Sequence, residues 1–409
     1  MTLPEPVKGA PDWLPPAAAA FDRVERAFLE TARLAGYQRV RTPIFEHTEL
    51  FSRGVGGSTD IVQKEMYTFT DKGGRSLTLR PEGTAGIVRA ALGAGVPKAG
   101  GLPAKWSYAG EYFRHERPQA GRQREFNQVG IEALGSDDPV LDAEVVLLGW
   151  EALCRAGVRD LTLLLNTLGD GDDRAAYHDV LNRYLDSVDD LPPDVEQRRA
   201  TNPLRAFDSK APGMAEVMAD APLLPDHVSA EAKEHHRVVV ELLEAEGVPL
   251  THDPQLVRGL DYYTRTTFEY QAGGLGAQNA VGGGGRYDGL AEELGWGERF
   301  TGIGWALGVD RTVLALASVE AAAEEPEPRV DLFVVTADAA LAGEALRLAG
   351  ELRRHGLPTD LGFDGRSLKA QFKAADRSGA RWARVLGSTE HQRGEGHGRG
   401  PSHRQHPAG

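Results

Sequence analysis

The sequence predicts an α+β core with antiparallel strands, interrupted by a helical insertion and followed by a small α/β domain. Residues 64–135 alternate apolar and polar side chains, without a long helical crossover, which is typical of antiparallel strands. Residues 171–250 are charged, helical in pattern and punctuated by prolines. Residues 330–386 alternate strand and helix patterns, which predicts parallel pairing.

The first predicted helix spans residues 15–36. Apolar side chains recur in it at spacings of three and four, and Gly36 supplies a stop signal. In the strand region that follows, Leu77 and Leu79 alternate with polar neighbours, which places Thr78, Arg80 and Glu82 on a polar side.

Strand signals return after the insertion, at residues 262–270. We expect the glycine run at 282–285 to form a turn, and the apolar segment from residue 301 to lead into a helix. The C-terminal region is predicted to contain strands at 330–336, 359–363 and 381–386 and helices at 340–355 and 366–378.

The length of 409 residues indicates more than one domain. We expect a first domain at 1–320, which contains the insertion 171–250, and a linker at 321–328. A second domain is expected at 329–387. Residues 388–409 contain no apolar side chain larger than Ala, so we expect a disordered tail there.

Composition excludes several classes of protein. A net charge of −14 argues against a protein that coats nucleic acid, although residues 329–409 hold 13 Lys/Arg against 9 Asp/Glu. Cys154 is the one cysteine, which excludes an internal disulfide and fits a reducing compartment. No apolar run approaches the roughly 18 residues that span a bilayer. The sequence therefore predicts a soluble cytoplasmic protein that does not bind membranes.

Four segments are dense in polar side chains suited to chemistry, although the standard glycine-rich nucleotide loops are missing. In the first segment, 77–84, Glu82 follows a predicted strand, where a carboxylate suits a substrate ammonium. An exposed charge in a turn is the alternative. In the last segment, 302–311, Arg311 lies at the beginning of a predicted helix. The alternative there is an arginine that is merely exposed to solvent. The segments are 77–84, 112–132, 256–263 and 302–311.

The second segment predicts a hairpin whose loop is rich in arginine. Guanidinium groups suit phosphate because each offers a planar pair of donors. On the returning strand, Gln128, Gly130 and Glu132 share one face, so a small polar ligand would find a floor without a side chain. A solvated hairpin is the alternative. The loop arginines are Arg114, Arg117, Arg122 and Arg124.

Together these segments resemble one enzyme family. The hairpin YFRHERPQAGRQREFNQ resembles motif 2 of class II aminoacyl-tRNA synthetases, GIGWALGVDR resembles motif 3, and RTPIFEHTELFSRGVG resembles motif 1. Two further segments, LVRGLDYYTRTTFEY and GGGGRYDGL, are similar to signatures of histidyl-tRNA synthetases. The resemblance covers residues 8–387 in order.

The resemblance implies a class II antiparallel sheet, dimerisation through motif 1 and a histidine–tRNA ligase activity. Such an enzyme converts L-histidine and ATP, accompanied by Mg²⁺, to histidyl-adenylate and pyrophosphate, and then transfers histidine to the 3′ end of tRNA-His. No metal-ligating side chains are expected. The alternative is the non-catalytic regulatory subunit of ATP phosphoribosyltransferase. The presence of Arg258 and of a C-terminal module favours the enzyme.

The resemblance also implies which residues bind histidine. Glu82 and Thr84 correspond to contacts of the α-amino group, and Gln128 to a contact on the carboxylate side. Glu132 and Tyr263 correspond to the pair that binds the imidazole nitrogens. The residues expected to line the same pocket are Tyr262, Tyr287, Arg114 and Arg258.

For ATP, the resemblance implies arginine contacts. Arg114 corresponds to the arginine on the α-phosphate, Arg122 to a further ATP contact and Arg311 to the arginine on the γ-phosphate. Arg258 corresponds to the arginine that stabilises charge at the α-phosphate during transfer, so Arg114 and Arg258 are the expected catalytic residues.

The C-terminal module departs from the family pattern. Family members continue past the third strand with further strands and a final helix, whereas the sequence after Gly387 is rich in Gly, His, Arg and Pro without periodicity. We therefore expect an incomplete, or altered, anticodon-binding domain.

Overall fold

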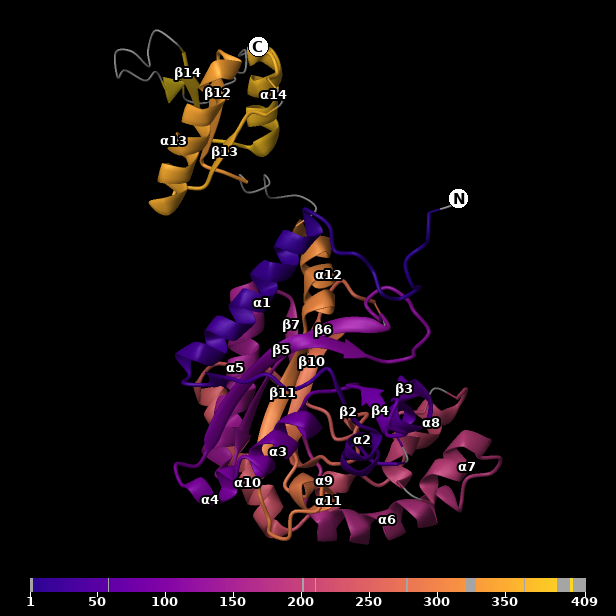
Figure 1. Cartoon of the computed structure of the whole chain (residues 1–409). Helices are drawn as coiled ribbons and strands as arrows, with labels where there is room; N and C mark the ends of the chain where they lie inside the picture. Colours follow the sequence, from indigo (N-terminus) through magenta and orange to yellow (C-terminus); the bar gives the residue numbers. More distant parts are fainter. Residues whose placement is uncertain are drawn as a thin grey trace, which may run out of the picture. The chain divides into compact units, whose positions relative to one another are not determined.

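A computed structural model describes residues 3–57, 59–200, 202–209, 211–276, 279–320, 329–363, 365–387 and 398–399. The chain divides into two compact units, Met1–Ala321 and Ala322–Gly409 (Figure 1). Among the described residues, no helix is both long enough and apolar enough to cross a membrane.

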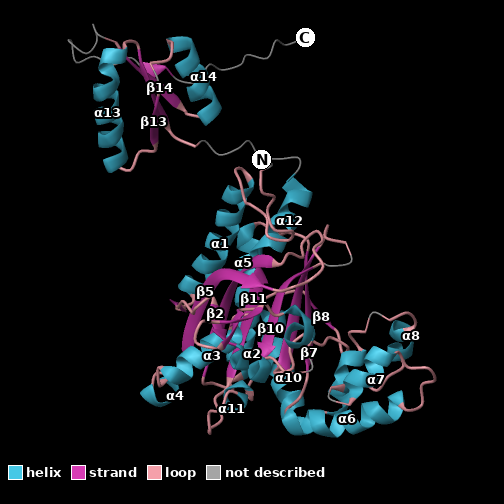
Figure 2. Ribbon diagram, turned by 45° about the vertical axis from the view of Figure 1, so that its right-hand side comes forward, coloured by secondary structure: helices cyan, strands magenta, loops and turns pink. Residues whose placement is uncertain are grey.

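An eight-stranded sheet organises the first unit, in the order β1-β5-β6-β11-β10-β9-β7-β8 (Figure 2). The strands are antiparallel except for the two edge pairs, β1 with β5 and β7 with β8. The predicted α+β class with an antiparallel core is therefore confirmed. The strands are β1 (Gln38–Arg39), β5 (Ala104–Phe113), β6 (Glu125–Leu134), β7 (Leu161–Thr167), β8 (Leu250–His252), β9 (Thr264–Ala272), β10 (Ala280–Arg286) and β11 (Gly302–Gly308).

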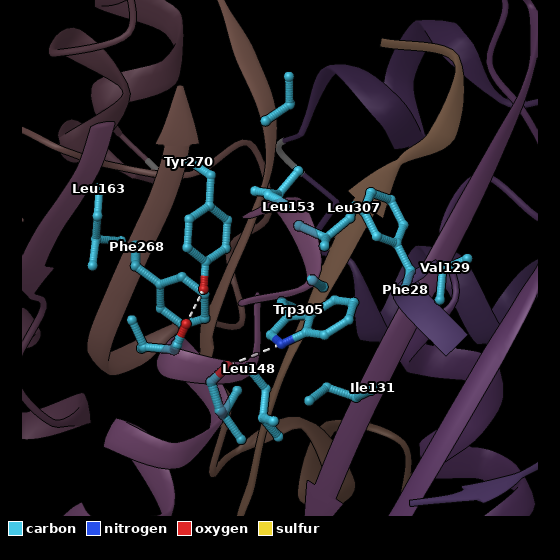
Figure 3. Close-up of a cluster of buried hydrophobic side chains, with 14 of the residues drawn as sticks. Phe28, Val129, Ile131, Leu148, Leu153, Leu163, Phe268, Tyr270, Trp305 and Leu307 are labelled. Atoms are coloured by element: carbon cyan, nitrogen blue, oxygen red, sulfur yellow. Dashed lines mark hydrogen bonds between the residues drawn. The ribbon is translucent and has the colours of Figure 1, made fainter. Parts of the chain in front are cut away.

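A hydrophobic core joins this sheet to α1 (Ala17–Leu34), α5 (Pro139–Ala156) and α12 (Val309–Glu320). Trp305 and Tyr270 lie at its centre, between the sheet and α5 (Figure 3). The Trp305 indole donates to the Val145 carbonyl over 2.9 Å, and the Tyr270 hydroxyl donates to the Val146 carbonyl over 2.6 Å. Each aromatic side chain thus buries its ring and still satisfies its polar atom.

A smaller sheet, in the order β2-β4-β3, lies beside short helices. The predicted strands of residues 64–135 pair antiparallel within each sheet, and a helix that was not predicted, α3, connects β4 of the small sheet to β5 of the large sheet. The α3 residues Ile87, Val88 and Ala91 are buried at helical spacing. The elements are β2 (Phe45–His47), α2 (Thr48–Gly54), a π-helical turn (Ile61–Glu65), β3 (Thr68–Thr70), β4 (Ser76–Leu79), α3 (Thr84–Gly93) and α4 (Val96–Ala99).

The polar side of β4 faces the interior rather than solvent. Thr78 and Arg80 are buried, whereas Leu77 and Leu79 are half-buried. Arg80 is satisfied there because it donates to the Glu111 and Thr42 carbonyls. Alternation therefore gives the two faces of this strand correctly but not which face is covered.

The insertion predicted at residues 171–250 is helical, as expected. Its α10 packs on α5, and most of its other helices form a second core that includes Tyr262, Tyr263 and Tyr287. The elements are α6 (Gly171–Leu185), α7 (Pro193–Arg199), a 3₁₀ turn (Pro203–Ala206), α8 (Met214–Ala219), α9 (Leu224–His227) and α10 (Ala230–Ala245), and α11 (Leu290–Glu293) follows β10.

The glycine run at 282–285 is not the predicted turn but the middle of β10. A Cβ on Gly283 would lie 2.5 Å from the Phe268 carbonyl oxygen and 2.9 Å from Arg258. A Cβ on Gly285 would lie 2.6 Å from the Thr266 carbonyl oxygen. Glycine is required here because neighbouring groups approach the strand too closely for side chains.

The second unit is a four-stranded sheet in the order β13-β12-β14-β15, with β12 parallel to β13 and β14. This confirms the predicted α/β pattern. The linker 321–328 lies outside the described residues, as does the predicted tail 388–409 except for β15. The elements are β12 (Leu332–Thr336), a 3₁₀ turn (Ala339–Leu341), α13 (Ala342–Arg354), β13 (Thr359–Leu361), α14 (Leu368–Ser378), β14 (Trp382–Leu386) and β15 (Gly398–Arg399).

Candidate active site

A cavity of about 310 Å³ opens beside β6, β10 and β11. It brings together ten of the eleven predicted site residues, which come from segments far apart in the sequence. The remaining one, Glu132, lies directly behind the cavity wall. The ten lining residues are Glu82, Thr84, Arg114, Arg122, Gln128, Arg258, Tyr262, Tyr263, Tyr287 and Arg311.

Glu82 lies in the turn between β4 and α3, and its side chain is held by the start of the helix. Its carboxylate accepts hydrogen bonds from the Thr84 N–H over 2.6 Å and from the Ala85 N–H over 3.0 Å. Burial raises the pKa of Glu82, and these N–H groups oppose the rise. A carboxylate has about four lone-pair sites, so capacity for a cationic ligand remains.

Glu132 is fully buried on β6 and accepts three hydrogen bonds from hydroxyl groups. The donors are Thr84 over 2.8 Å, Tyr108 over 2.9 Å and Tyr287 over 2.5 Å. Burial raises the pKa of Glu132 to about 8, although the three hydroxyls lower it. The site thus holds a carboxylate whose ionisation is poised near neutral pH.

Gly304 lines the cavity and lies against Glu132, whereas Gly130 is not among the lining residues. A Cβ on Gly304, in β11, would collide with the Glu132 carboxylate, and a Cβ on Gly130 would collide with the Tyr108 ring. The Tyr108 ring covers the face of Gly130 on which an open floor was predicted, and Gly304 on the neighbouring strand lines the cavity instead. A ligand beside Gly304 can approach Glu132 closely because no side chain intervenes.

Tyrosine rings form one wall of the cavity. The rings of Tyr262 and Tyr263 are 4.7 Å apart, and those of Tyr262 and Tyr287 are 5.8 Å apart. All three side chains are buried, and burial raises the pKa of each, so they remain neutral hydroxyl groups. This wall offers both ring faces and hydrogen-bonding groups.

At the other end, two arginines are held by backbone carbonyls. Arg114 donates to the Pro81 carbonyl over 2.9 Å and lies over the Phe126 ring. Arg311 donates to the Gly121 carbonyl over 2.7 Å and to the Ala280 carbonyl over 2.6 Å. Backbone carbonyls thus orient both guanidinium groups, and a guanidinium group suits an anion such as phosphate. Arg122, in the hairpin loop, instead pairs with Glu116.

Several lining residues were not predicted. Glu269 pairs with Arg258, and its position on β9 could have been found because it alternates with the buried Phe268 and Tyr270. Asp310 is buried beside Arg311, accepts a hydrogen bond from the Asn127 N–H over 2.6 Å, and has its pKa raised by burial to about 6. Asp310 lies inside the segment 302–311 that the sequence singles out, directly before Arg311, so its position in that segment could have found it. The described residues contain no group of three or more His, Cys, Asp or Glu arranged to hold a metal ion.

Comparisons with known proteins agree with this geometry. The sequence matches the histidyl-tRNA synthetase family over residues 9–312 and the anticodon binding domain family over residues 331–396. The histidine–tRNA ligase of Nocardia farcinica is 51% identical over 385 residues, which cover 94% of this chain and 90% of that protein.

Among solved structures, the crystal structure of apo S. aureus histidyl-tRNA synthetase matches with a TM-score of 0.80 and 34% identity, over 98% of this chain and 97% of that chain. A Bacillus halodurans protein, described as an ATP phosphoribosyltransferase regulatory subunit/histidyl-tRNA synthetase, matches with a TM-score of 0.63 and 22% identity, over 87% of this chain and 92% of that chain. This second match shows the shared fold alone.

Proposed function

This chain belongs to the histidyl-tRNA synthetase family, and we propose that it activates L-histidine with ATP and then transfers the histidyl group to tRNA-His. The observation that carries the proposal is the meeting of the histidine signatures and the motif 2 and motif 3 arginines around one cavity. Histidine and ATP would occupy its two ends, with the reacting carboxylate and α-phosphate between them.

In this proposal the carboxylates select the amino acid. Glu82 binds the α-ammonium group together with the Thr84 hydroxyl, and Gln128 lies on the carboxylate side. Glu132 and Tyr263 bind the two imidazole nitrogens. An apolar side chain of similar size is rejected because it would leave these buried polar groups without partners.

The arginines act on the phosphates. Attack of the histidine carboxylate on the α-phosphorus forms the acyl–phosphate bond and releases pyrophosphate, while negative charge gathers on the α-phosphate oxygens. In this proposal Arg114 and Arg258 stabilise that charge, and Arg311 and Arg122 hold the remaining ATP. Fixed cations lower the barrier because they need no reorganisation during the reaction. No protein nucleophile is needed, so positioning supplies much of the remaining acceleration.

Magnesium is proposed to enter as part of the substrate, MgATP. Mg²⁺ keeps several waters and binds phosphate oxygens in nucleotide sites of this kind, so it requires few protein ligands.

We further propose that the chain works in the cytoplasm as a homodimer formed through the motif 1 region, residues 41–56. The exposed apolar side chains of Ile44, Phe45 and Phe69 support this proposal, because they lie together on and beside the small sheet.

The test is histidine-dependent exchange of labelled pyrophosphate into ATP. Purified protein is expected to exchange label with L-histidine and with none of the other nineteen amino acids, and to charge tRNA-His. Absence of exchange in folded protein would contradict the proposal and favour a regulatory role like that named for the Bacillus halodurans protein.

A further inference from the structure

The segment 256–263 carries three polar side chains that line the cavity but has no regular secondary structure. Arg258, Tyr262 and Tyr263 all face the cavity, and the segment precedes β9 without a ladder of its own. Backbone in such a segment must be fixed by other partners, because a catalytic group displaced by about 1 Å can cost 10²-fold in rate. The partners of this segment come largely from the helical insertion.

Asp261, in the middle of the segment, is held by two side chains of the insertion. Arg205 donates to the Asp261 Oδ1 atom through Nη2 over 2.6 Å and through Nε over 3.2 Å. Asn202 donates to the same oxygen over 2.9 Å. Arg205 is only 8% exposed, so water does little to screen this pair.

A second arginine of the insertion holds the backbone of the same segment. Arg174, on α6, donates through Nη1 to the Asp261 carbonyl over 3.1 Å and to the Tyr263 carbonyl over 2.8 Å. On the opposite side, the Asp261 N–H donates to the Val55 carbonyl over 3.3 Å. Asp261 therefore joins the insertion, the motif 1 region and the cavity wall.

The charge of the insertion supports a positioning role over attraction of RNA. Residues 171–250 contain 8 Lys/Arg against 17 Asp/Glu, a net of −9. An acidic surface disfavours binding to a phosphate backbone. Two of the eight cationic side chains, Arg174 and Arg205, face inward to the segment 256–263 instead.

We infer that the insertion is a positioning element of the active site, in which Arg205 and Arg174 hold Asp261 and thereby set the positions of Arg258 and Tyr263. This inference rests on the proposed function. Neither arginine lines the centre of the reaction; both act through the segment that does. Loss of Arg205 should therefore slow the reaction by displacing Arg258, while the fold of the first unit survives on its own cores.

The test compares Arg205→Ala and Arg205→Lys with Arg199→Ala in the full chain, by histidine-dependent pyrophosphate exchange. Arg199 is a matched control because it lies in the same insertion and pairs only with the exposed Asp186 and Glu196 among the contacts described. We expect R205A to lower kcat about 10- to 100-fold, R205K to retain part of the lost rate, and R199A to match the wild type. Thermal unfolding of each variant reports the folded fraction.

A double variant separates positioning from general destabilisation. If Arg205 acts through Arg258, R205A should add little to the loss already caused by Arg258→Ala, because coupled residues are not additive. Asp261→Asn, which keeps the shape of the side chain, tests the same contact should R205A fail to fold. The inference alone would be overturned if the rate losses of R205A and Arg258→Ala multiplied in the double variant as independent effects do. It would also be overturned if folded R205A or D261N exchanged label at the wild-type rate. Absence of exchange in the wild type would overturn it together with the proposed function.

Discussion

Arg258 and Glu269 form an ion pair in the wall of the cavity, with Nη1 and Oε2 2.5 Å apart. Glu269 also accepts a hydrogen bond from the Gln271 amide over 3.0 Å, so its carboxylate is fixed on β9. Burial alone would lower the pKa of Arg258, but Glu269 and neighbouring groups raise it. The guanidinium therefore stays charged inside the cavity wall, with its direction set by a strand of the main sheet.

Arg258→His should lower the rate of exchange by on the order of 10²–10³, while histidine affinity changes little. The reason is that a fixed cation near the α-phosphate stabilises charge that exists only in the transition state. Single-turnover adenylation and equilibrium binding of histidine would be measured side by side. Parallel losses of binding and rate would identify Arg258 as a ligand of ground-state histidine instead.

Glu269→Gln should lower the exchange rate by about 10-fold, without a large change in the Michaelis constant for histidine. Glutamine keeps the size of the side chain but removes the charge that orients Arg258. Glu241→Gln is the matched control, because Glu241 pairs with Arg237 on the exposed face of α10. Equal rates for E269Q and the wild type would mean that Arg258 is positioned adequately by other contacts.

Glu132→Ala should show the opposite emphasis, weakening histidine binding more than the rate at saturating histidine. Removal of a buried hydrogen-bonding group that leaves its partners unsatisfied costs about 1–3 kcal/mol, which corresponds to a roughly 5- to 150-fold weaker affinity. The Michaelis constant for ATP serves as an internal control, since Glu132 is proposed to contact histidine and not ATP. A rise in the Michaelis constant for ATP alone would mean that Glu132 contacts ATP rather than histidine.

The raised pKa of Glu132 also predicts a pH dependence of stability. Its folded value of about 8 exceeds the ordinary value of 4.5, so the folded protein binds the proton more tightly than the unfolded chain. The stability contributed by this group is thus present below about pH 4.5 and is lost as the pH rises through 8. In the absence of histidine, the melting temperature of Glu132→Gln minus that of the wild type should increase from pH 6 to pH 9. A difference that stays constant or shrinks would contradict the raised pKa.

The sequence allows the site to be predicted where its residues lie in local motifs, and fails where contacts are distant. The hairpin arginines follow from the composition of the loop, and the face shared by Gln128, Gly130 and Glu132 follows from strand alternation. The pairing of Arg205 with Asp261 joins residues 56 apart and leaves no periodic signal. Glycine composition also misled the interpretation of residues 282–285, because glycine is typical both of turns and of strands crowded by neighbours.

The two units should separate the two steps of the reaction. Every described hydrophobic cluster belongs to one unit only, so each unit has a core of its own. The cavity residues lie within the first unit, whereas the match to the anticodon binding domain family lies within the second. A chain ending at Ala321 should therefore retain histidine-dependent exchange at close to the rate of the full chain.

Charging of tRNA-His by that shortened chain should be impaired chiefly in affinity. Loss of one of two linked binding modules weakens overall binding by on the order of 10²-fold, whereas the acceptor end can still reach the cavity at high tRNA concentration. Steady-state aminoacylation would be measured against tRNA concentration for the full chain, for the shortened chain, and for the first unit joined to the complete C-terminal module of the Nocardia farcinica relative. The Michaelis constant for tRNA should be lower for this last protein than for the full chain, because the composition of the full chain is altered after Gly387. Equal tRNA constants for all three would show that the second unit does not contribute to tRNA binding.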